Sequence, residues 1–293
     1  MKLGQTDITI GKIAFGCWRF ASHETSTADT LIRTALDAGM NLIDTADIYG
    51  FSEFPHLDDK GFGQAELRLG EVLAAAPSLR KQMVLATKGG IDAIRPYDSS
   101  YAYLMRAIDA SLARLQTDYV DLYQIHRPDL TVPMSEVARA LDEMVESGKI
   151  RTVGVSNFTV SQMRALKAHL KHPITTIQPE FSALEQSPLE TGILDYAEEI
   201  SATVLAWSPL AGGKIPTENG PVQDVLDRIA TAYGISRSTA ALAFTRGFGA
   251  SVLPIIGTQN PARITESGYA AQVNLTGREI YDVVEAYRGE GMP

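Results

Sequence analysis

Short runs of apolar residues alternate with longer amphipathic stretches along this chain of 293 residues. The apolar runs are as short and as uniformly hydrophobic as parallel strands that are covered on both faces of a sheet. They predict eight strands, at Ile13–Gly16, Asn41–Asp44, Met83–Thr87, Tyr119–Ile125, Thr152–Val155, Ile174–Gln178, Thr203–Ala206 and Ser251–Ile256.

The amphipathic stretches predict helices. Between Tyr101 and Leu115, for example, apolar residues recur at Leu104, Ile108 and Leu112, which is the spacing of one helix face. The predicted helices are Ala28–Ala38, Ala65–Ala76, Tyr101–Leu115, Ser135–Ser147, Thr159–Leu170, Pro188–Ile200 and Val222–Tyr233.

This alternation of strands and helices favours an α/β fold, the closed (β/α)8 or TIM barrel, as a single domain over residues 1–293. An open, doubly wound parallel sheet is the alternative architecture. Residues Met1–Leu3 and Ile8–Ile10 predict a hairpin that closes the bottom of the barrel. Two segments look additional, namely the polar loop Phe51–Gly63 and a helix at Ser236–Phe248.

Composition narrows the class of protein. The chain has 26 Lys and Arg against 35 Asp and Glu, a net charge of −9, which argues against a nucleic-acid-binding surface. Its one cysteine, Cys17, cannot form an internal disulfide and is expected to be a buried structural thiol. No apolar leader or membrane-spanning stretch is recognisable, so we expect a cytoplasmic protein without a membrane partner. No large apolar helix face is left unaccounted for, which favours a monomer.

Candidate chemistry gathers at the carboxyl ends of the predicted strands. Asp44 and Tyr49 lie at the end of one predicted strand, and Lys88 and His126 follow two others; in a barrel these ends share one mouth. A tyrosine has a pKa of about 10, and a neighbouring ammonium lowers it. The four residues together indicate proton delivery to a carbonyl, with His126 orienting the oxygen. Each one alone has an ordinary structural explanation, such as a turn cap for Asp44.

The sequence motifs for a nucleotide site or a metal site are weaker than the pattern of candidate catalytic residues. The nearest approach to a dinucleotide fingerprint, GFGQAE at Gly61–Glu66, lacks the third glycine and does not follow a strand. Ser208–Lys214 and Gly257–Arg263 remain as candidate phosphate loops, although each could be an ordinary connection. His169 and His172 have no thiol or carboxylate cluster beside them, so no metal site is predicted.

Seven segments, in order along nearly the whole chain, resemble the aldo-keto reductases. They are IDTADIYG (43–50), TKGG (87–90), LYQIHRPD (122–129), GKIRTVGVSNF (148–158), IQPEF (177–181), AWSPLAGG (206–213) and LPIIGTQNPARITES (253–267). The spacing AAAPSLRKQMVLATK (74–88) is similar to a bacterial branch of general reductases.

The resemblance implies a (β/α)8 barrel that binds NADPH without a Rossmann domain. Tyr49 would be the general acid, Lys88 and Asp44 its tuners, and His126 the orienting group. The implied cofactor-binding residues are Ser156, Asn157, Gln178, Trp207, Ser208, Pro209, Leu210, Gly212, Lys214, Gly257, Thr258, Gln259, Arg263 and Glu266. Trp18, and the loop that begins at Phe51, would shape the carbonyl pocket.

Three positions depart from the family pattern. Trp207 stands where many members have tyrosine, Ser267 where many have asparagine, and Gly257 where many NADPH-preferring members have lysine. Arg263 is retained, and a guanidinium suits a 2′-phosphate. We therefore expect NADPH, with NADH left open.

The expected function is NADPH-dependent reduction of small aldehydes or ketones to alcohols in an apolar pocket. One alternative is a cofactor-binding regulatory subunit with slow or no catalysis. Another is an alcohol or sugar dehydrogenase that works in the oxidative direction.

Overall fold

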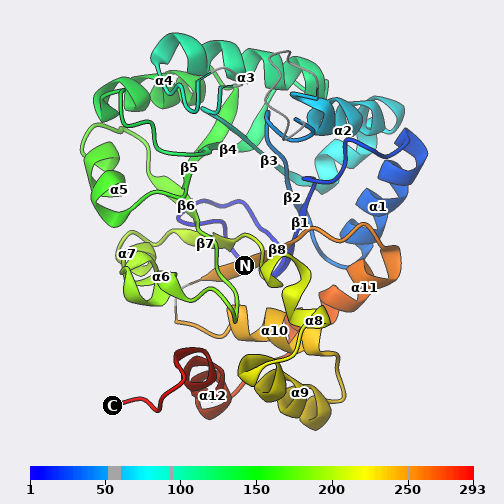
Figure 1. Ribbon diagram of the computed structural model, residues 1–293. Helices are drawn as coiled ribbons and strands as arrows, with labels where there is room; N and C mark the ends of the chain where they lie inside the picture. Colours follow the sequence, from blue (N-terminus) through cyan, green and yellow to red (C-terminus); the bar gives the residue numbers. More distant parts are fainter. Residues whose placement is uncertain (52–60, 93–94, 250) are drawn as a thin grey trace.

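The computed structural model is a closed barrel of parallel strands, seen end-on in Figure 1. It describes residues 1–51, 61–92, 95–249 and 251–293. The strands are β1 (Ala14–Gly16), β2 (Leu42–Asp44), β3 (Val84–Gly89), β4 (Val120–Ile125), β5 (Ile150–Ser156), β6 (Ile174–Gln178), β7 (Thr203–Ala206) and β8 (Val252–Ile256).

Closure of the barrel confirms the (β/α)8 prediction. Ala14 of β1 pairs with Ile255 of β8 in parallel register, which joins the first and last strands. An open, doubly wound sheet would leave those two strands at separate edges, so that alternative is wrong. Each predicted strand is present, although β3 continues to Gly89 and β5 begins earlier, at Ile150.

Helices surround the barrel on all sides (Figure 1). They are α1 (Thr25–Asp37), α2 (Gln64–Ala75), α3 (Tyr101–Leu115), α4 (Met134–Glu146), α5 (Val160–Lys167), α6 (Ser187–Glu190), α7 (Ile193–Glu199), α8 (Lys214–Thr217), α9 (Pro221–Tyr233), α10 (Arg237–Thr245), α11 (Pro261–Tyr269) and α12 (Gly277–Arg288). Three 3₁₀ turns complete the set, η1 (Pro77–Gln82), η2 (Ala211–Gly213) and η3 (Ala270–Gln272).

The helix predictions need several corrections, since α8 and α11, like α12, lie outside the predicted helix ranges. The segment predicted as one helix, Pro188–Ile200, is two helices, α6 and α7, because Gly192 adopts a left-handed conformation with φ of 72°. Helix α12 has no counterpart among the predictions, although Thr276 and Glu279 form a capping box at its start. The additional helix expected over Ser236–Phe248 is present as α10.

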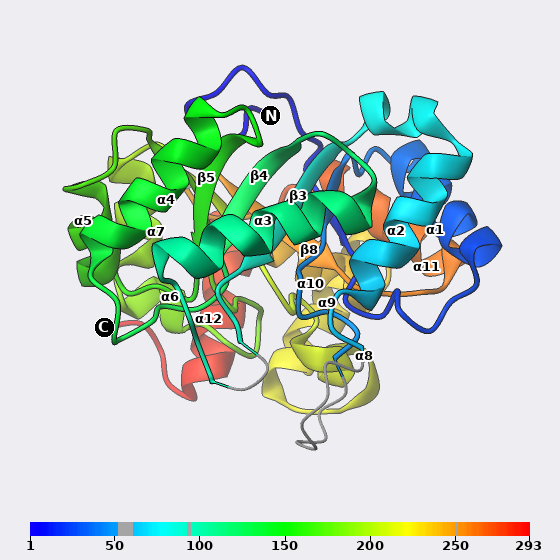
Figure 2. The same ribbon diagram turned by 90° about the horizontal axis from the view of Figure 1, so that it is seen from above.

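The lower end of the barrel is plugged. Leu3 N donates to Ile8 O at 2.9 Å and Ile10 N donates to Met1 O at 2.8 Å, so the predicted hairpin is present, as one bridge rather than two strands. Leu3 and Ile10 pack against strand residues that point into the barrel, such as Leu122. Figure 2 shows this N-terminal segment at the opposite end of the barrel from α8. The open end at which ligands can bind is therefore the other end of the barrel, its mouth.

No helix in the described part of the chain is both long and apolar enough to span a membrane.

Candidate active site

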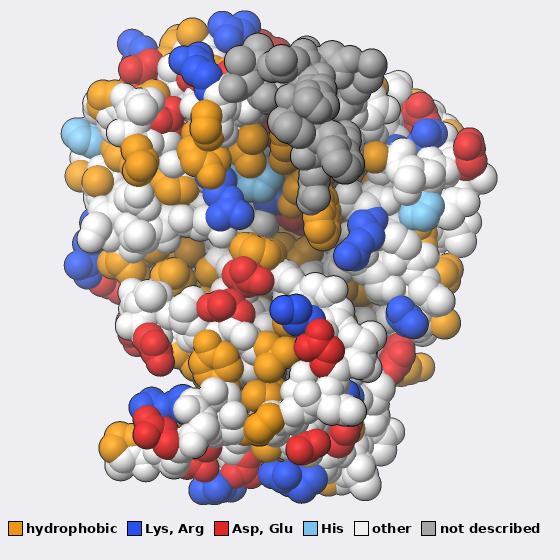
Figure 3. Space-filling view, in the orientation of Figure 1, with side chains coloured by type: hydrophobic (Ala, Val, Ile, Leu, Met, Phe, Trp, Pro, Cys, Tyr) orange, Lys and Arg blue, Asp and Glu red, His pale blue; other side chains and the backbone are white. Residues whose placement is uncertain are grey.

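The barrel places the four predicted catalytic residues at its mouth. Asp44 ends β2, Lys88 lies near the end of β3, His126 follows β4, and Tyr49 stands on the loop after β2. Figure 3 shows this face hollowed at its centre, with a histidine side chain in the hollow and hydrophobic side chains around it. The parallel strand order accounts for the gathering, because all strand carboxyl ends open to the same side.

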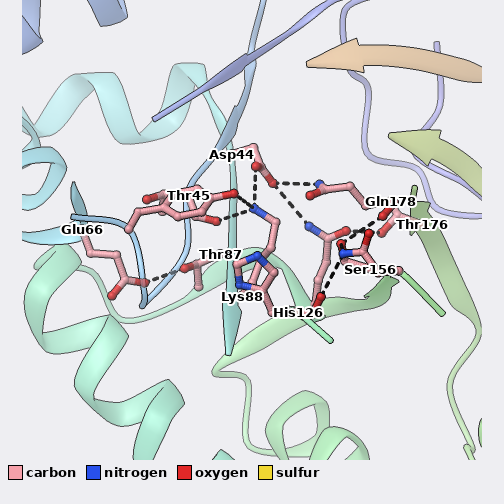
Figure 4. A network of polar contacts seen from close by, with 12 residues as sticks. Asp44, Thr45, Glu66, Thr87, Lys88, His126, Ser156, Thr176 and Gln178 are labelled. Carbon is pink, nitrogen blue, oxygen red and sulfur yellow. Dashed lines mark hydrogen bonds and ion pairs between the residues drawn. The ribbon is translucent and has the colours of Figure 1, made fainter. Parts of the chain in front are cut away.

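Lys88 is the centre of the arrangement (Figure 4). Its Nζ donates to Asp44 Oδ2 at 2.6 Å, to the Thr45 carbonyl at 2.9 Å and to Tyr49 Oη at 3.0 Å. An ammonium has three donors, so these contacts use all of them and fix the group. Lys88 is 0% exposed, so its charge acts on Tyr49 without much screening by water.

Burial and charge act in opposite directions on the tyrosine and the lysine. Burial raises the pKa of Tyr49 above its usual value, and the Lys88 ammonium offsets only part of that rise. Burial on its own would lower the pKa of Lys88, but Asp44 and Tyr49 raise it further, so the net direction is upward. At neutral pH the site therefore holds a protonated phenol beside a charged ammonium. The sequence predicted the effect of Lys88 on Tyr49 but not the larger effect of burial.

His126 is a neutral imidazole in this setting. Burial lowers its pKa well below the usual value, and Lys88 and Arg127 add to that effect. Its ring meets the Tyr49 ring edge-to-face at 5.8 Å between centroids. Its Nδ1 is buried and has no hydrogen-bond partner among the described residues, which leaves polar capacity beside the tyrosine.

Gln124 and Thr176, two buried polar residues that the sequence did not single out, extend this network. Gln124 Nε2 and Gln178 Nε2 both donate to Asp44 Oδ1, at 3.4 and 3.1 Å. Thr176 Oγ1 donates in turn to Gln124 Oε1 at 3.2 Å (Figure 4). A polar residue inside an otherwise apolar strand was the signal available for Gln124 and Thr176.

Four of the predicted cofactor-binding residues lie together. Asn157 Nδ2 donates to Ser156 Oγ at 2.8 Å, and Ser156 Oγ donates to the Gln178 carbonyl at 2.9 Å. Trp207 Nε1 donates to Asn157 Oδ1 at 3.0 Å. Three neighbouring strands, β5, β6 and β7, thus present one connected polar surface beside His126, whose carbonyl also accepts from Asn157 Nδ2 at 3.2 Å.

The first predicted phosphate loop is a tight, solvent-facing turn. Ser208 Oγ accepts from Gly212 N at 2.9 Å, and Gly212 and Gly213 both have left-handed φ values, 66° and 101°. These two conformations favour glycine. Pro209 and Leu210 lie within the turn, and Lys214 follows it as the first residue of α8, with an exposed side chain.

The second predicted phosphate loop leads from β8 into α11. Asn260 Oδ1 accepts from Ala262 N at 2.9 Å and from Arg263 N at 3.3 Å, which caps the helix. Within the loop, Thr258 Oγ1 accepts from Asn260 N at 3.4 Å, and Gln259 Nε2 donates to Gly257 O at 3.1 Å.

Glu266, on α11, lines a cavity of about 660 Å³ between α9, α10 and α11. Tyr269 and Ser236 line the same cavity. Glu266, one of the predicted cofactor-binding residues, therefore faces open space rather than packed side chains.

The residues predicted to shape the carbonyl pocket make fewer contacts within the described residues than the four predicted catalytic residues. Trp18 is 57% exposed, and Phe51 meets Phe62 edge-to-face at 6.4 Å between ring centroids. The rest of the loop that we expected to shape the carbonyl pocket, 52–60, lies outside the described residues. Cys17 is 0% exposed and burial raises its pKa strongly, which agrees with a structural thiol.

The sequence did not single out one buried carboxyl group, that of Asp47, close to the four predicted catalytic residues. Asp47 N donates to the Lys88 carbonyl at 3.1 Å, but the Asp47 side chain is 1% exposed and has no hydrogen-bond partner among the described residues. Glu66 lies nearby, bonded to Thr87 Oγ1 at 2.5 Å and to Arg114 Nε at 2.7 Å. Burial, and then Glu66, raise the pKa of Asp47 well above its usual value.

The substitution Asp47→Asn is expected to stabilise the protein at neutral pH. The folded state holds the Asp47 proton more tightly than the unfolded chain, where an aspartate has a pKa of about 3.9. Protonation therefore stabilises the wild type fully below that value, and this stabilisation is lost as pH rises through the raised pKa. Asparagine is neutral throughout, so its advantage should grow from about pH 4 upward. Thermal unfolding across pH measures it, at about 2–4 °C per kcal/mol. A lower melting temperature for Asp47→Asn at neutral pH would show that the ionised carboxylate is needed.

A model of the Aldo/keto reductase family matches residues 12–288. The chain belongs to the aldo/keto reductase family. Among curated relatives of this aldo/keto reductase, the 6-dehydroglucose reductase of Novosphingobium aromaticivorans is 48% identical over 298 residues, covering 100% of this chain and 96% of that protein. The 6-dehydroglucose reductase of Agrobacterium fabrum is 34% identical and covers 94% of each chain.

Solved structures agree with this assignment. An aldo/keto reductase from Klebsiella pneumoniae, crystallised with NADP and acetate, superposes with a TM-score of 0.77 at 27% identity, covering 95% of this chain and 92% of that one. The present aldo/keto reductase is therefore an oxidoreductase that uses a nicotinamide cofactor to act on carbonyl groups.

Proposed function

We propose that this aldo/keto reductase uses NADPH to reduce the C6 aldehyde of a hexose to the primary alcohol, with Tyr49 as the proton donor. The contact that carries the chemistry is Lys88 Nζ to Tyr49 Oη at 3.0 Å, with Asp44 behind the lysine at 2.6 Å. The substrate class rests on the 48% identity, along the whole chain, to a 6-dehydroglucose reductase.

The proton step follows from the charges around Tyr49. When bound, the cofactor supplies a hydride, which adds to the carbonyl carbon. The developing alkoxide takes the proton of Tyr49 Oη, and the product is an alcohol. The phenolate left on Tyr49 is stabilised by the Lys88 ammonium, which Asp44 and the Thr45 carbonyl hold in place. The neutral imidazole of His126 donates a hydrogen bond that orients the carbonyl oxygen.

The residues around the mouth fit a nicotinamide cofactor. Ser156, Asn157 and Gln178 form a polar surface that suits the carboxamide, and the half-buried indole of Trp207 offers a plane for stacking on the ring. The glycine-containing turn Ser208–Lys214 provides an exposed lysine for the pyrophosphate, and Arg263 with Gly257–Gln259 suits the 2′-phosphate.

Polar groups at the rim support a polyhydroxylated substrate. Arg127 follows His126 directly, and its guanidinium carbon lies 6.0 Å from the centroid of the Trp207 ring. Glu180 pairs with Trp207 through a backbone bridge. Hydroxyl groups on a sugar suit such donors and acceptors, whereas the apolar pocket with few fixed polar groups that the sequence predicts would favour a broad range of carbonyl substrates.

Cofactor oxidation by the purified protein tests the proposal. The panel consists of 6-dehydroglucose, glucose, an aromatic aldehyde and a dicarbonyl, each with NADPH and with NADH. We expect the highest kcat/KM for 6-dehydroglucose with NADPH, and glucose as its product. A preference for the aromatic aldehyde would contradict the substrate class. Tight NADPH binding without turnover of any substrate would instead indicate a regulatory, cofactor-binding subunit.

A further inference from the structure

Two loops that are far apart in the sequence meet beside the β8–α11 connection. Arg19 Nη1, on the loop after β1, donates to the Gly257 carbonyl at 3.2 Å. His23 Nε2, on the same loop, lies 3.0 Å from Gln259 Oε1. The contact is possible because β1 and β8 are neighbours where the barrel closes (Figure 1). The loop after β1 therefore forms one wall of the proposed 2′-phosphate site.

The glycine at position 257 makes room for that wall. Its φ is not left-handed, so the backbone there would accept another residue. A Cβ at Gly257 would have one neighbour within 4 Å, Arg19 Nη1 at 3.7 Å. A side chain at 257 would thus extend next to the space that the Arg19 guanidinium occupies. The structure thus has a cation, the Arg19 guanidinium, next to position 257, and this cation comes from the loop after β1 rather than from the β8–α11 connection.

Neither guanidinium beside this loop is neutralised by a carboxylate. Within the described residues, Arg19 forms no ion pair and stacks on Trp18, with 5.1 Å from its guanidinium carbon to the ring centroid. Arg263 is exposed and its side chain has no ion-pair or hydrogen-bond partner in the same part of the chain. Arg19 reaches the β8–α11 connection from the loop after β1, and Arg263 stands in the first turn of α11, so two cations without a carboxylate partner in the described part of the chain flank this connection in a protein with net charge −9, which points to an anionic ligand.

The backbone at the start of α11 contributes little to that ligand. The N–H groups of Ala262 and Arg263 already donate to Asn260 Oδ1. A phosphate at the first turn of α11 would therefore rely on side chains rather than on these two N–H groups. A guanidinium has five donors, of which Arg19 uses one on the Gly257 carbonyl, so its other donors remain available for phosphate oxygens.

We infer that Arg19 is a cofactor-specificity residue, which binds the 2′-phosphate of NADPH together with Arg263 and takes the place of a side-chain cation at position 257. The hydrogen bond to the Gly257 carbonyl orients its guanidinium before the cofactor arrives. The inference rests on the proposed use of NADPH, and it assigns the selection of the 2′-phosphate to a residue outside the β8–α11 loop.

The test measures binding without catalysis. Isothermal titration calorimetry with 2′,5′-ADP and with 5′-AMP compares ligands that differ only in the 2′-phosphate. Wild type is expected to prefer 2′,5′-ADP. Arg19→Gln should weaken 2′,5′-ADP by about ten-fold or more, the usual size of a charge-assisted hydrogen bond, and leave 5′-AMP unchanged. Arg33→Gln, which removes an exposed guanidinium that pairs with Asp29 on α1, is the matched control and should change neither ligand.

A rescue variant separates charge from loop structure. Adding Gly257→Lys to Arg19→Gln returns a cation to the same space and should recover most of the lost 2′,5′-ADP affinity. The inference is overturned if Arg19→Gln leaves both affinities unchanged or weakens both ligands equally. If wild type itself binds 2′,5′-ADP no better than 5′-AMP, the proposed NADPH preference fails, an outcome distinct from failure of Arg19 alone.

Discussion

Replacing Tyr49 with phenylalanine is expected to lower carbonyl turnover by about a hundred-fold to ten-thousand-fold, the usual contribution of a positioned general acid. The substitution removes one hydroxyl, whose contact is the 3.0 Å hydrogen bond from Lys88 Nζ, and keeps the ring that packs against His126. The proposed carboxamide and phosphate contacts do not involve Tyr49. Steady-state kinetics with NADPH, together with calorimetric titration of NADPH, should therefore show lost turnover and unchanged cofactor affinity.

A matched removal of a tyrosine hydroxyl is available elsewhere. Tyr101 Oη donates to Glu143 Oε2 at 2.5 Å, between the outer helices α3 and α4, and takes part in none of the proposed contacts, so Tyr101→Phe should leave turnover unchanged. If Tyr49→Phe retained turnover near that of wild type, another group would have to be the proton donor. If it lost NADPH affinity and turnover together, the hydroxyl would be acting in binding.

Replacing Lys88 with methionine is expected to cost both activity and about 3–5 kcal/mol of stability. Lys88 and Asp44 form a buried pair at 2.6 Å, and methionine would leave the Asp44 carboxylate without its cation in a site where both side chains are almost fully enclosed. Phenolate formation on Tyr49 would also lose its stabilising charge. Urea unfolding measures the free energy of unfolding, and single-turnover kinetics measures the chemical step.

The double variant Asp44→Asn/Lys88→Met separates these two losses. It leaves no unpaired charge at positions 44 and 88, so it should regain part of the stability while activity stays low. Asparagine retains an oxygen for the amides of Gln124 and Gln178. Equal stability of wild type and Lys88→Met would show that the pair contributes nothing net to the fold, and recovered activity in the double variant would exclude the role proposed for Lys88.

The fold was predictable to the extent that local pattern determines it. Strands that are buried on both faces are short apolar runs, and their alternation with amphipathic segments left few architectures. The break at Gly192 was harder to predict, because the apolar pattern on either side of this glycine is similar whether the helix continues through it or is interrupted there. Helix α12 did have a signal in the capping box of Thr276 and Glu279, and its Val283 and Val284 pack with α9 and α10.

The candidate site likewise contains residues that the sequence could predict and residues that it could not. Residues at strand ends, such as Lys88 and His126, could be placed because topology alone brings those ends together. The roles of Gln124 and Asp47 depend on which way a strand or loop residue points, which register decides. The contact of Arg19 with Gly257 joins residues separated by 238 positions, so no local pattern could predict it.

The positions of the two tryptophans give this enzyme an optical property. Trp18 and Trp207 are the only tryptophans in the sequence, and both stand at strand ends around the mouth, one 57% exposed and the other half-buried and bonded to Asn157. Light absorbed selectively by tryptophan is therefore absorbed only at the rim of the barrel. The tryptophan emission of the unlabelled, native chain therefore comes from that rim, from one exposed and one half-buried indole.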